Sequence, residues 1–332
     1  MPWKGEKDAY KIWLSEVILQ QTRVEQGWEY YNRFVAKFPT INLLAHASDQ
    51  EVFKLWEGLG YYSRCRNLLQ TARKITYEYE GKFPQNHHEI IGLPGIGPYT
   101  AAAIASFAFN LPYAVVDGNV IRVLARFFGL NTDPSTSQGK KEFAALAQEL
   151  LDTGKPGMYN QAIMDFGATV CKPQNPLCDQ CPLQKKCTAF QQDMISQLPV
   201  KSVKKPKKQR WFHYFIQPTG NSMLIRKRTG RDIWQNLHEF PVMETDSDVL
   251  IPDAGQLPAF IHSFSKENLR FVSGIYRQEL THQTIYAKFY ILEGASLSLP
   301  DEYFPVAISE LRHYAFPVVI NRFMTSGQQL IP

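Results

Sequence analysis

The sequence predicts two domains, a mostly α-helical domain followed by a smaller domain of the α+β class. Apolar residues recur at helical spacing up to about Pro199, and short alternating segments replace that pattern beyond residue 210. The chain of 332 residues is also too long for one small core, because a domain takes about 150 residues. We therefore expect a helical domain over 1–195, a linker over 196–210 and an α+β domain over 211–332.

Each of these parts has its own pattern of residues. Segments 8–22 and 140–153 repeat apolar positions every three or four residues, as helices do. The linker packs six basic residues into 201–210 and contains prolines, a composition that favours an extended chain. Segments such as 211–218 and 284–292 alternate in polarity and end near Gly, Pro or Asn, which predicts strands.

Composition and charge limit the class of protein. Charged residues make up 20% and hydrophobic residues 44%, as in an ordinary globular protein, and the net charge of +5 only weakly favours a polyanionic partner. The first residues carry no apolar stretch of signal-peptide length, and no later run is long enough to span a bilayer. We therefore expect a cytoplasmic protein of bacterial type, near the nucleoid if it binds DNA, with no membrane partner.

A glycine-rich turn precedes one of the predicted helices. Gly95 and Gly97 stand directly before Pro98, and glycine reaches backbone angles that are closed to other residues. Such a turn can present its amide groups at a helix N-terminus, where they bind a phosphate. A plain connection between two helices is the alternative.

Two carboxyl groups are candidates for chemistry. Asp117 precedes a helical run, so that it is an excellent helix cap, and capping alone could account for it. Glu16 falls between Ile12 and Trp13 on the wheel of an almost wholly apolar helix. Desolvation penalises a buried carboxylate and raises its pKa, so Glu16 could act as an acid near neutral pH. A core glutamate satisfied by an arginine or a backbone amide is the alternative.

Four of the five cysteines crowd into one loop, whereas Cys65 stands apart. In a reducing compartment such cysteines are better candidates for metal ligands than for disulfides. Structural zinc sites more often use two C-x2-C pairs, so the spacing C-x6-C-x2-C-x5-C favours an iron-sulfur cluster, with zinc or no metal as the alternatives. The four cysteines are Cys171, Cys178, Cys181 and Cys187.

Five segments, in this order, resemble the adenine DNA glycosylases of the MutY family, members of the helix-hairpin-helix superfamily: SEVILQQTRV, LWEGLGYYSR, LPGIGPYTAAAI, VVDGNVIRVL and NQAIMDFGATVC. The likeness covers most of residues 2–190. It implies a helix-hairpin-helix glycosylase fold, a [4Fe-4S] cluster on the loop over 171–187, and a Nudix-like second domain. It further implies that Glu16 is the general acid, that Asp117 stabilises the positively charged sugar, and that Tyr99 supplies an assisting hydroxyl.

The resemblance also implies a set of DNA contacts. Gln21 and Tyr61 match wedge positions that fill the gap left by a flipped nucleotide, although Tyr61 suits an aromatic core equally well. The acidic metal-binding motif of Nudix hydrolases is absent, which implies recognition of the oxidised guanine without nucleotide hydrolysis. The other positions that match contacts with the DNA, the adenine or the opposite guanine are Trp3, Lys4, Thr22, Leu59, Gly95, Gly97, Asn119, Gln161, Thr281 and His282.

The chain departs from the family pattern in three ways. Lys4 replaces an arginine, and Leu280 replaces the aromatic residue that precedes the Thr281 and His282 positions. A Thr-His pair on a strand would otherwise usually be structural. Relatives also carry a further helix where this chain begins, so we expect either a start codon assigned too late or a naturally short protein with a less stable cluster domain.

The function that the resemblance implies is excision of adenine mispaired with 8-oxoguanine or guanine in double-stranded DNA, by a monomer. Endonuclease III type enzymes carry a lysine at the position of Tyr99, and its amine forms a Schiff base with the sugar. Tyrosine cannot do so, which favours a glycosylase that leaves the strand intact. A bifunctional glycosylase and lyase, and a noncatalytic DNA-binding protein held together by its cluster, are the alternatives.

Overall fold

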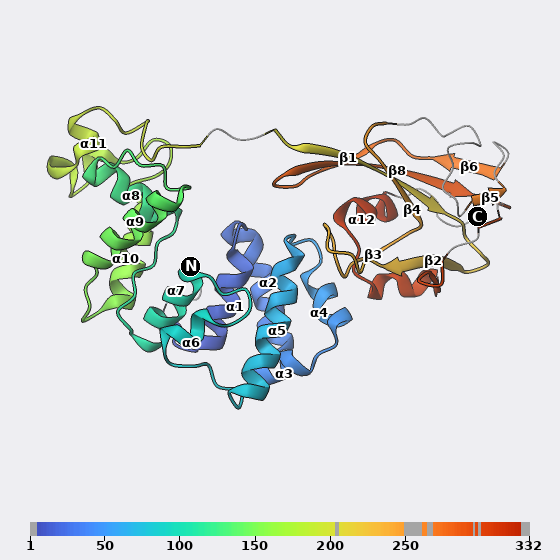
Figure 1. Cartoon of the computed structure of the whole chain (residues 1–332), viewed down its shortest axis with the longest axis horizontal. Coiled ribbons are helices and arrows are strands. Elements are labelled where there is room, and N and C mark those ends of the chain that lie inside the picture. Colours follow the sequence, from blue (N-terminus) through green and yellow to red (C-terminus); the bar gives the residue numbers. More distant parts are fainter. Residues whose placement is uncertain are drawn as a thin grey trace. The chain divides into compact units, whose positions relative to one another are not determined.

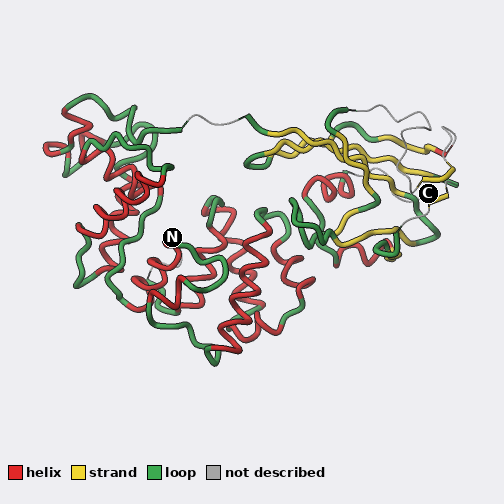
Figure 2. The backbone as a smooth tube through the Cα atoms, viewed as in Figure 1, coloured by secondary structure: helices red, strands yellow, loops and turns green. Residues whose placement is uncertain are grey.

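The computed structural model describes residues 5–202, 206–248, 261–263, 268–294, 296–297 and 300–326, without the side chains of 261–263 and 296–297. Figure 2 shows helices in the first part of the chain and strands in the last part, as the sequence predicted. Contacts divide the chain into two compact units, one of Met1–His46 with Arg66–Lys204 and one of Ala47–Cys65 with Lys205–Pro332. The domain boundaries at 195 and 211 stay a prediction.

The first unit is built from helices, labelled in Figure 1. Local signals start several of them, because the side chains of Asp8, Asn86 and Thr136 each accept a backbone N–H from the first turn that follows. Pro98 and Pro156 begin two others, at a position where the missing N–H costs no hydrogen bond. The helices are α1 (Ala9–Leu19), α2 (Val24–Lys37), α3 (Ile41–His46), α5 (Tyr62–Glu78, beginning in the second unit), α6 (His87–Ile91), α7 (Pro98–Phe109), α8 (Gly118–Phe128), α9 (Ser137–Glu149), α10 (Pro156–Thr169) and α11 (Thr188–Gln191).

Helix α1 is buried over residues 12–18, as its nearly unbroken apolar pattern predicted. Ser15 satisfies its hydroxyl on the carbonyl of Ile12 at 2.7 Å, a bond within the helix itself. Glu16 is the one carboxyl in the α1 sequence, and only 5% of its surface is exposed.

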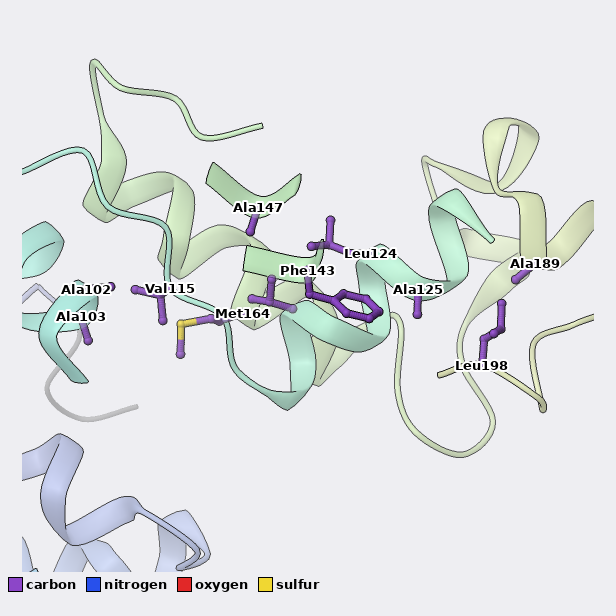
Figure 3. Packing of buried hydrophobic residues seen from close by; sticks show 11 residues of the cluster. Ala102, Ala103, Val115, Leu124, Ala125, Phe143, Ala147, Met164, Ala189 and Leu198 are labelled. Atoms are coloured by element: carbon purple, nitrogen blue, oxygen red, sulfur yellow. The ribbon is translucent and has the colours of Figure 1, made fainter. Parts of the chain in front are cut away.

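A hydrophobic cluster joins α7 to α11 and fixes α8 from several sides. Phe143 of α9, 1% exposed, lies in this cluster with Leu124 and Ala125 of α8 (Figure 3). Met164 of α10 and Leu198, at the start of the linker, belong to the same cluster. Burial of this apolar surface contributes about 25 cal/mol per Å². The helix that Asp117 caps is therefore held by packing and not by its cap alone.

The second unit contains a mixed sheet with two parallel strands, β1 (Lys208–Ile216) and β8 (Gln283–Leu292), at its centre. Antiparallel neighbours of these two strands are β4 (Val242–Thr245), β6 (Leu269–Val272) and β7 (Tyr276–Glu279). A smaller sheet has the order β10 (Phe304–Ala307), β2 (Ser222–Lys227), β3 (His238–Glu239), and β5 (Ile261–Ser263) pairs with β9 (Ser296–Leu297).

Helices complete the second unit. They are α4 (Asp49–Trp56), a 3-10 helix (Ile308–His313) and α12 (Val318–Thr325). Phe323 of α12 stacks on Phe289 of β8 with ring centroids 4.0 Å apart, so α12 packs on the larger sheet. In the described part of the chain, no helix has the length and apolar character needed to cross a lipid bilayer.

Candidate active site

A hollow of about 790 Å³ lies among α1, α7, α8 and α10 in the first unit. Glu16, Tyr99 and Asp117 all line it, although Glu16 is far from the other two in the sequence. The N-terminal ends of α7 and α8 meet at this hollow, since Gly97 and Gly118 also line it. Its volume lies in the range of pockets that bind small organic groups.

Glu16 is a buried acid. Desolvation raises the pKa of this carboxyl from 4.5 to about 7, because burial penalises the charged form. A hydrogen bond from Tyr99 lowers this pKa, and the negative charge of Asp117 raises it. Burial also raises the pKa of the Tyr99 hydroxyl, which therefore stays protonated and donates. Near neutral pH, Glu16 can hold a proton or release it.

Asp117 caps α8, as the sequence predicted, and its carboxylate has three fixed donors. Its Oδ1 accepts the backbone N–H of Asn119 at 2.8 Å and that of Val120 at 2.7 Å. Its Oδ2 accepts the side-chain amide of Asn119 at 2.7 Å. A negative charge at the N-terminus of a helix is favoured by the helix dipole. Asp117 therefore presents a fixed anion to the hollow that Glu16 also lines.

The two hairpin glycines differ in what they require. Gly95 has φ +72°, and a side chain there would place Cβ 2.5 Å from the Cβ of Asn67. Gly97 has φ −90° and ψ 176°, an extended conformation open to any residue, with no atom within 4 Å of an added Cβ. Gly95 therefore uses a backbone angle that favours glycine, whereas Gly97 does not. Both still line the hollow at the start of α7.

A second hollow, of about 420 Å³, lies on another side of Glu16. Met164 and Asp165 of α10 line both hollows together with Glu16. Gln161 lines the smaller one, and its Nε2 donates to Oδ1 of Asp165 at 3.0 Å. The structure thus places Gln161 near Glu16. Trp3 and Lys4 lie outside the described residues.

Both predicted wedge residues adopt left-handed backbone. Gln21 has φ 60° and is exposed just after α1, and Tyr61 has φ 48° just before α5. Such a conformation costs a non-glycine residue about 1–3 kcal/mol and is enriched at functional sites. The Tyr61 side chain is 43% exposed, whereas Trp56 and Tyr62 are buried. Tyr61 is therefore not part of an aromatic core.

The two positions predicted to face the opposite guanine differ in exposure. Thr22 is half-buried, and its hydroxyl donates to the carbonyl of Gln20 at 3.4 Å. Leu59 is 6% exposed, so its side chain is not available for the predicted DNA contact in this conformation.

The four loop cysteines line one small hollow of about 30 Å³ with apolar neighbours. Desolvation and then the other three thiols raise the pKa of Cys178. Within the described ranges, no three His, Cys, Asp or Glu side chains are arranged to hold a single metal ion. Zinc needs its sulfurs about 2.3 Å from one point, whereas a [4Fe-4S] cluster takes four thiolates around a larger body. The donor set fits such a cluster.

Thr281 and His282 occupy an exposed turn between β7 and β8 rather than a strand. The N–H of Leu280 donates to the carbonyl of Gln283 at 2.8 Å and closes this turn. The Thr281 hydroxyl shares a hydrogen bond with the hydroxyl of Tyr61, which also belongs to the second unit. Two predicted DNA contacts, 220 positions apart, therefore meet.

Residues 14–149 match the family model described as HhH-GPD superfamily base excision DNA repair protein. An adenine DNA glycosylase of Buchnera aphidicola subsp. Schizaphis graminum is 37% identical over 247 residues, which cover 74% of this chain and 71% of that protein. The chain belongs to the adenine DNA glycosylase family. The resemblance to this family that the five segments predicted is thereby confirmed.

A second adenine DNA glycosylase and one solved glycosylase structure are also similar to this chain. The adenine DNA glycosylase of Rattus norvegicus is 47% identical over 211 residues, which cover 60% of this chain and 41% of that protein. The structure of a thermostable thymine-DNA glycosylase has 31% sequence identity and a TM-score of 0.54, covering 58% of this chain and 88% of that chain. The mostly helical glycosylase fold is confirmed.

Sequence analysis did not identify Arg122, a buried arginine that connects the candidate site to the cysteine loop. Arg122 is 8% exposed, and its Nη2 donates to Oδ1 of Asn119 at 2.8 Å. Its Nε donates to the backbone carbonyl of Cys171 at 2.7 Å. Because Asn119 also donates to Asp117, hydrogen bonds run without a break from Asp117 to the first loop cysteine.

A second buried arginine holds the loop itself. Arg126 is 3% exposed, and its Nη1 donates to the carbonyl of Lys172 at 2.8 Å and lies 3.5 Å from Sγ of Cys171. Its Nε donates to the carbonyl of Leu198 at 3.1 Å. Arg122 and Arg126 are four residues apart in a mainly apolar helix, so they share one helix face. That spacing was the available signal, since a buried guanidinium must find acceptors.

Proposed function

We propose that this protein excises adenine mispaired with 8-oxoguanine, or with guanine, from double-stranded DNA. The observation that carries the proposal is a buried carboxyl of pKa about 7, Glu16, in one hollow with the fixed carboxylate of Asp117. Cleavage of an N-glycosidic bond needs a protonated leaving base and an anion close to an oxocarbenium-like sugar. Two carboxyls in different environments supply one of each. The names of the relatives supply adenine as the base.

In this mechanism Glu16 gives its proton to N7 of adenine while the bond from the sugar C1′ to the base N9 breaks. The bonding electron pair leaves with the base, and the sugar becomes positively charged. Asp117 stabilises that charge until water adds to C1′ and loses a proton. The Tyr99 hydroxyl donates to Glu16 and so stabilises the carboxylate that proton transfer leaves behind.

The adenine must leave the base stack to reach Glu16. Backbone amides beside Gly95 and Gly97, at the N-terminus of α7, bind a phosphate of the DNA. Gln21 and Tyr61 fill the gap that the flipped nucleotide leaves, which their strained backbones support. Gln161, on the smaller hollow beside Glu16, faces the adenine.

The protein is proposed to leave the DNA strand intact. A lyase needs an amine at the sugar, and among the residues that the structure describes, those lining the larger hollow include no lysine. Lys7 lines the smaller hollow, but its Nζ donates to the carbonyl of Phe107 at 3.2 Å. Borohydride should therefore trap little wild-type protein on DNA, and substantial trapping would favour the bifunctional alternative.

We also propose that Cys171, Cys178, Cys181 and Cys187 hold a [4Fe-4S] cluster. The apolar hollow that the four thiols share supports the proposal. A bound cluster would crosslink the loop and so stabilise it, next to the backbone that Arg122 and Arg126 hold. Iron and sulfide should match one cluster per chain, whereas one zinc per chain would refute the proposal.

Recognition of the opposite base is assigned to the second unit. We propose a Nudix-like domain in which the Thr281 hydroxyl and the His282 imidazole contact 8-oxoguanine. The exposed turn and the hydrogen bond to Tyr61 support this role. The protein acts as a monomer on its DNA, in the cytoplasm of a bacterial-type cell.

Single-turnover base release tests the whole proposal. Duplexes carry adenine opposite 8-oxoguanine, guanine or thymine, and release should be fastest opposite 8-oxoguanine and slowest opposite thymine. Glu16→Gln should bind the duplex but release adenine at least about a hundredfold more slowly. Binding without release by the wild-type protein would instead support the noncatalytic alternative.

A further inference from the structure

Helix α4 contacts the chain that precedes α12, within the second unit. Gln50 and Lys54 are four residues apart and share one face of α4, and Glu57 directly follows the end of that helix. The side-chain amide of Gln50 donates to the carbonyl of His313 at 3.2 Å. The Nζ of Lys54 donates to the carbonyl of Tyr314 at 3.0 Å. We call Gln50, Lys54 and Glu57 the α4 stripe.

Glu57 makes the strongest contact of the α4 stripe. Its Oε1 accepts the backbone N–H of Phe316 at 2.7 Å, and its Oε2 pairs with Lys54 at 2.6 Å. The Glu57 side chain is only 16% exposed, and Phe316 is fully buried and stacks on Phe240. Hydrogen bonds to a carboxylate are stronger than neutral ones, and shielding from water strengthens them further. The α4 stripe therefore binds a rigid part of the second unit.

Further hydrogen bonds connect the segment that Glu57 binds to the turn that carries Thr281 and His282. The N–H of Val319, in the first turn of α12, donates to Oε1 of Gln278 in β7 at 3.1 Å. Arg322 of α12 donates to the carbonyl of Arg277 at 3.2 Å. Strand β7 leads directly into the turn. A shift of the segment held by Glu57 would therefore move the turn with it.

Tyr61 makes a second contact with the turn that carries Thr281 and His282. A hydrogen bond stabilises the turn between α4 and Tyr61, because the indole Nε1 of Trp56 donates to the carbonyl of Gly60 at 3.0 Å. Tyr61 then shares its hydroxyl with Thr281. Two separate attachments, one at α4 and one at Tyr61, fix the orientation of the turn as well as its distance.

We propose that the α4 stripe is a docking site that holds the Thr281–His282 turn against Tyr61, and that Glu57 is a positioning residue for discrimination between 8-oxoguanine and guanine opposite adenine. The inference rests on the proposed function, because it takes Thr281 and His282 as the contacts to 8-oxoguanine. Glu57 touches neither base and takes no part in bond cleavage.

The test measures kcat/KM for adenine release opposite 8-oxoguanine and opposite guanine, with hydrogen exchange of 313–316 measured on the same full-length proteins. Glu57→Ala should lower the value opposite 8-oxoguanine about tenfold, the equivalent of one hydrogen bond to a charged group. The value opposite guanine should stay within about twofold, and exchange at the Phe316 amide should become faster. Glu57→Gln keeps an acceptor for Phe316 and should retain most of the preference.

Two further variants complete the design. Glu149→Ala removes an exposed glutamate of α9 and is the matched control, which should change neither the preference nor the exchange. Gln50→Ala weakens the α4 stripe at an exposed position and serves if Glu57→Ala does not fold. It should lower the preference in the same direction by a smaller factor.

The outcomes separate the inference from the function on which it rests. Faster exchange in Glu57→Ala with an unchanged preference for 8-oxoguanine would overturn the inference and leave the proposed function intact. Unchanged exchange would show that Glu57 does not hold Phe316, which also overturns it. A wild-type protein without any preference for 8-oxoguanine would refute the proposed lesion specificity, and the inference with it.

Discussion

Glu16→Gln replaces the titratable carboxyl with a neutral amide of nearly the same shape, so it isolates the role of the buried acid. A general acid contributes about a hundredfold or more to the rate, and base release by the variant should fall at least that far. In the wild-type protein only the protonated form of Glu16 is active. With a pKa of about 7, kcat/KM should stand at about a tenth of its maximum at pH 8 and fall about tenfold for each further pH unit.

The same pKa predicts a change in stability. Burial raises the pKa of Glu16 above its value of 4.5 in water, so between pH 4.5 and about 7 the folded protein binds more protons at this site than the unfolded chain. The free energy of unfolding therefore falls as the pH rises through that window, and the loss is complete above it. At about 1.36 kcal/mol per pKa unit, the loss amounts to about 3 kcal/mol.

Glutamine stays neutral, so the variant escapes this loss. Relative to wild type, Glu16→Gln should gain about 3 kcal/mol of stability between pH 4.5 and pH 8. Single-turnover adenine release and urea unfolding, both followed from about pH 5 to about pH 9, measure the two effects. Release within tenfold of wild type, or a stability difference that does not change with pH, would refute the role of Glu16 as a buried acid.

Four further substitutions test the surroundings of Glu16. Asp117→Asn should keep the helix cap, with stability within about 0.5 kcal/mol of wild type by urea unfolding, but lose base release; retained release would exclude Asp117 as the stabilising anion. Gly95→Ala forces Cβ into Asn67 at a positive φ and should cost about 1–3 kcal/mol, whereas Gly97→Ala should fold normally and weaken only DNA binding, and equal stabilities would contradict this difference. Arg122→Gln leaves Asn119 and the loop carbonyl unsupported, so it should slow base release more than it weakens binding in a titration; a change in binding alone would argue against the hydrogen-bonded path.

The separate properties of the two carboxyls could be predicted from the sequence. The unbroken apolar pattern of α1 predicted the burial of Glu16, and the position of Asp117 before a helical run predicted its cap. Their common hollow could not be predicted in this way, because it depends on how α1 packs beside α7 and α8. Only the resemblance to the family implied that the two groups work together.

Hydrogen bonds from side chains to backbone atoms could not be predicted from the sequence. Arg122 and Arg126 bind carbonyl oxygens of the cysteine loop, and every residue has such an oxygen. The α4 stripe likewise reaches the backbone of 313–316, so residue types there do not reveal the contact. Gly97 is a related case, because the sequence shows where glycine occurs but not which backbone angle it adopts.

The hydrogen-bonded path from Asp117 ends on the carbonyl oxygen of Cys171 and not on its sulfur. Along this path, electron gain or loss by a group bound to the thiolates would therefore act on the anion through the peptide unit of Cys171. A change of oxidation state that leaves the loop backbone in place would leave these hydrogen bonds unchanged, whereas loss of the group and collapse of the loop would misalign Asp117. Along this path, the reaction centre responds to the shape of the loop rather than to its charge.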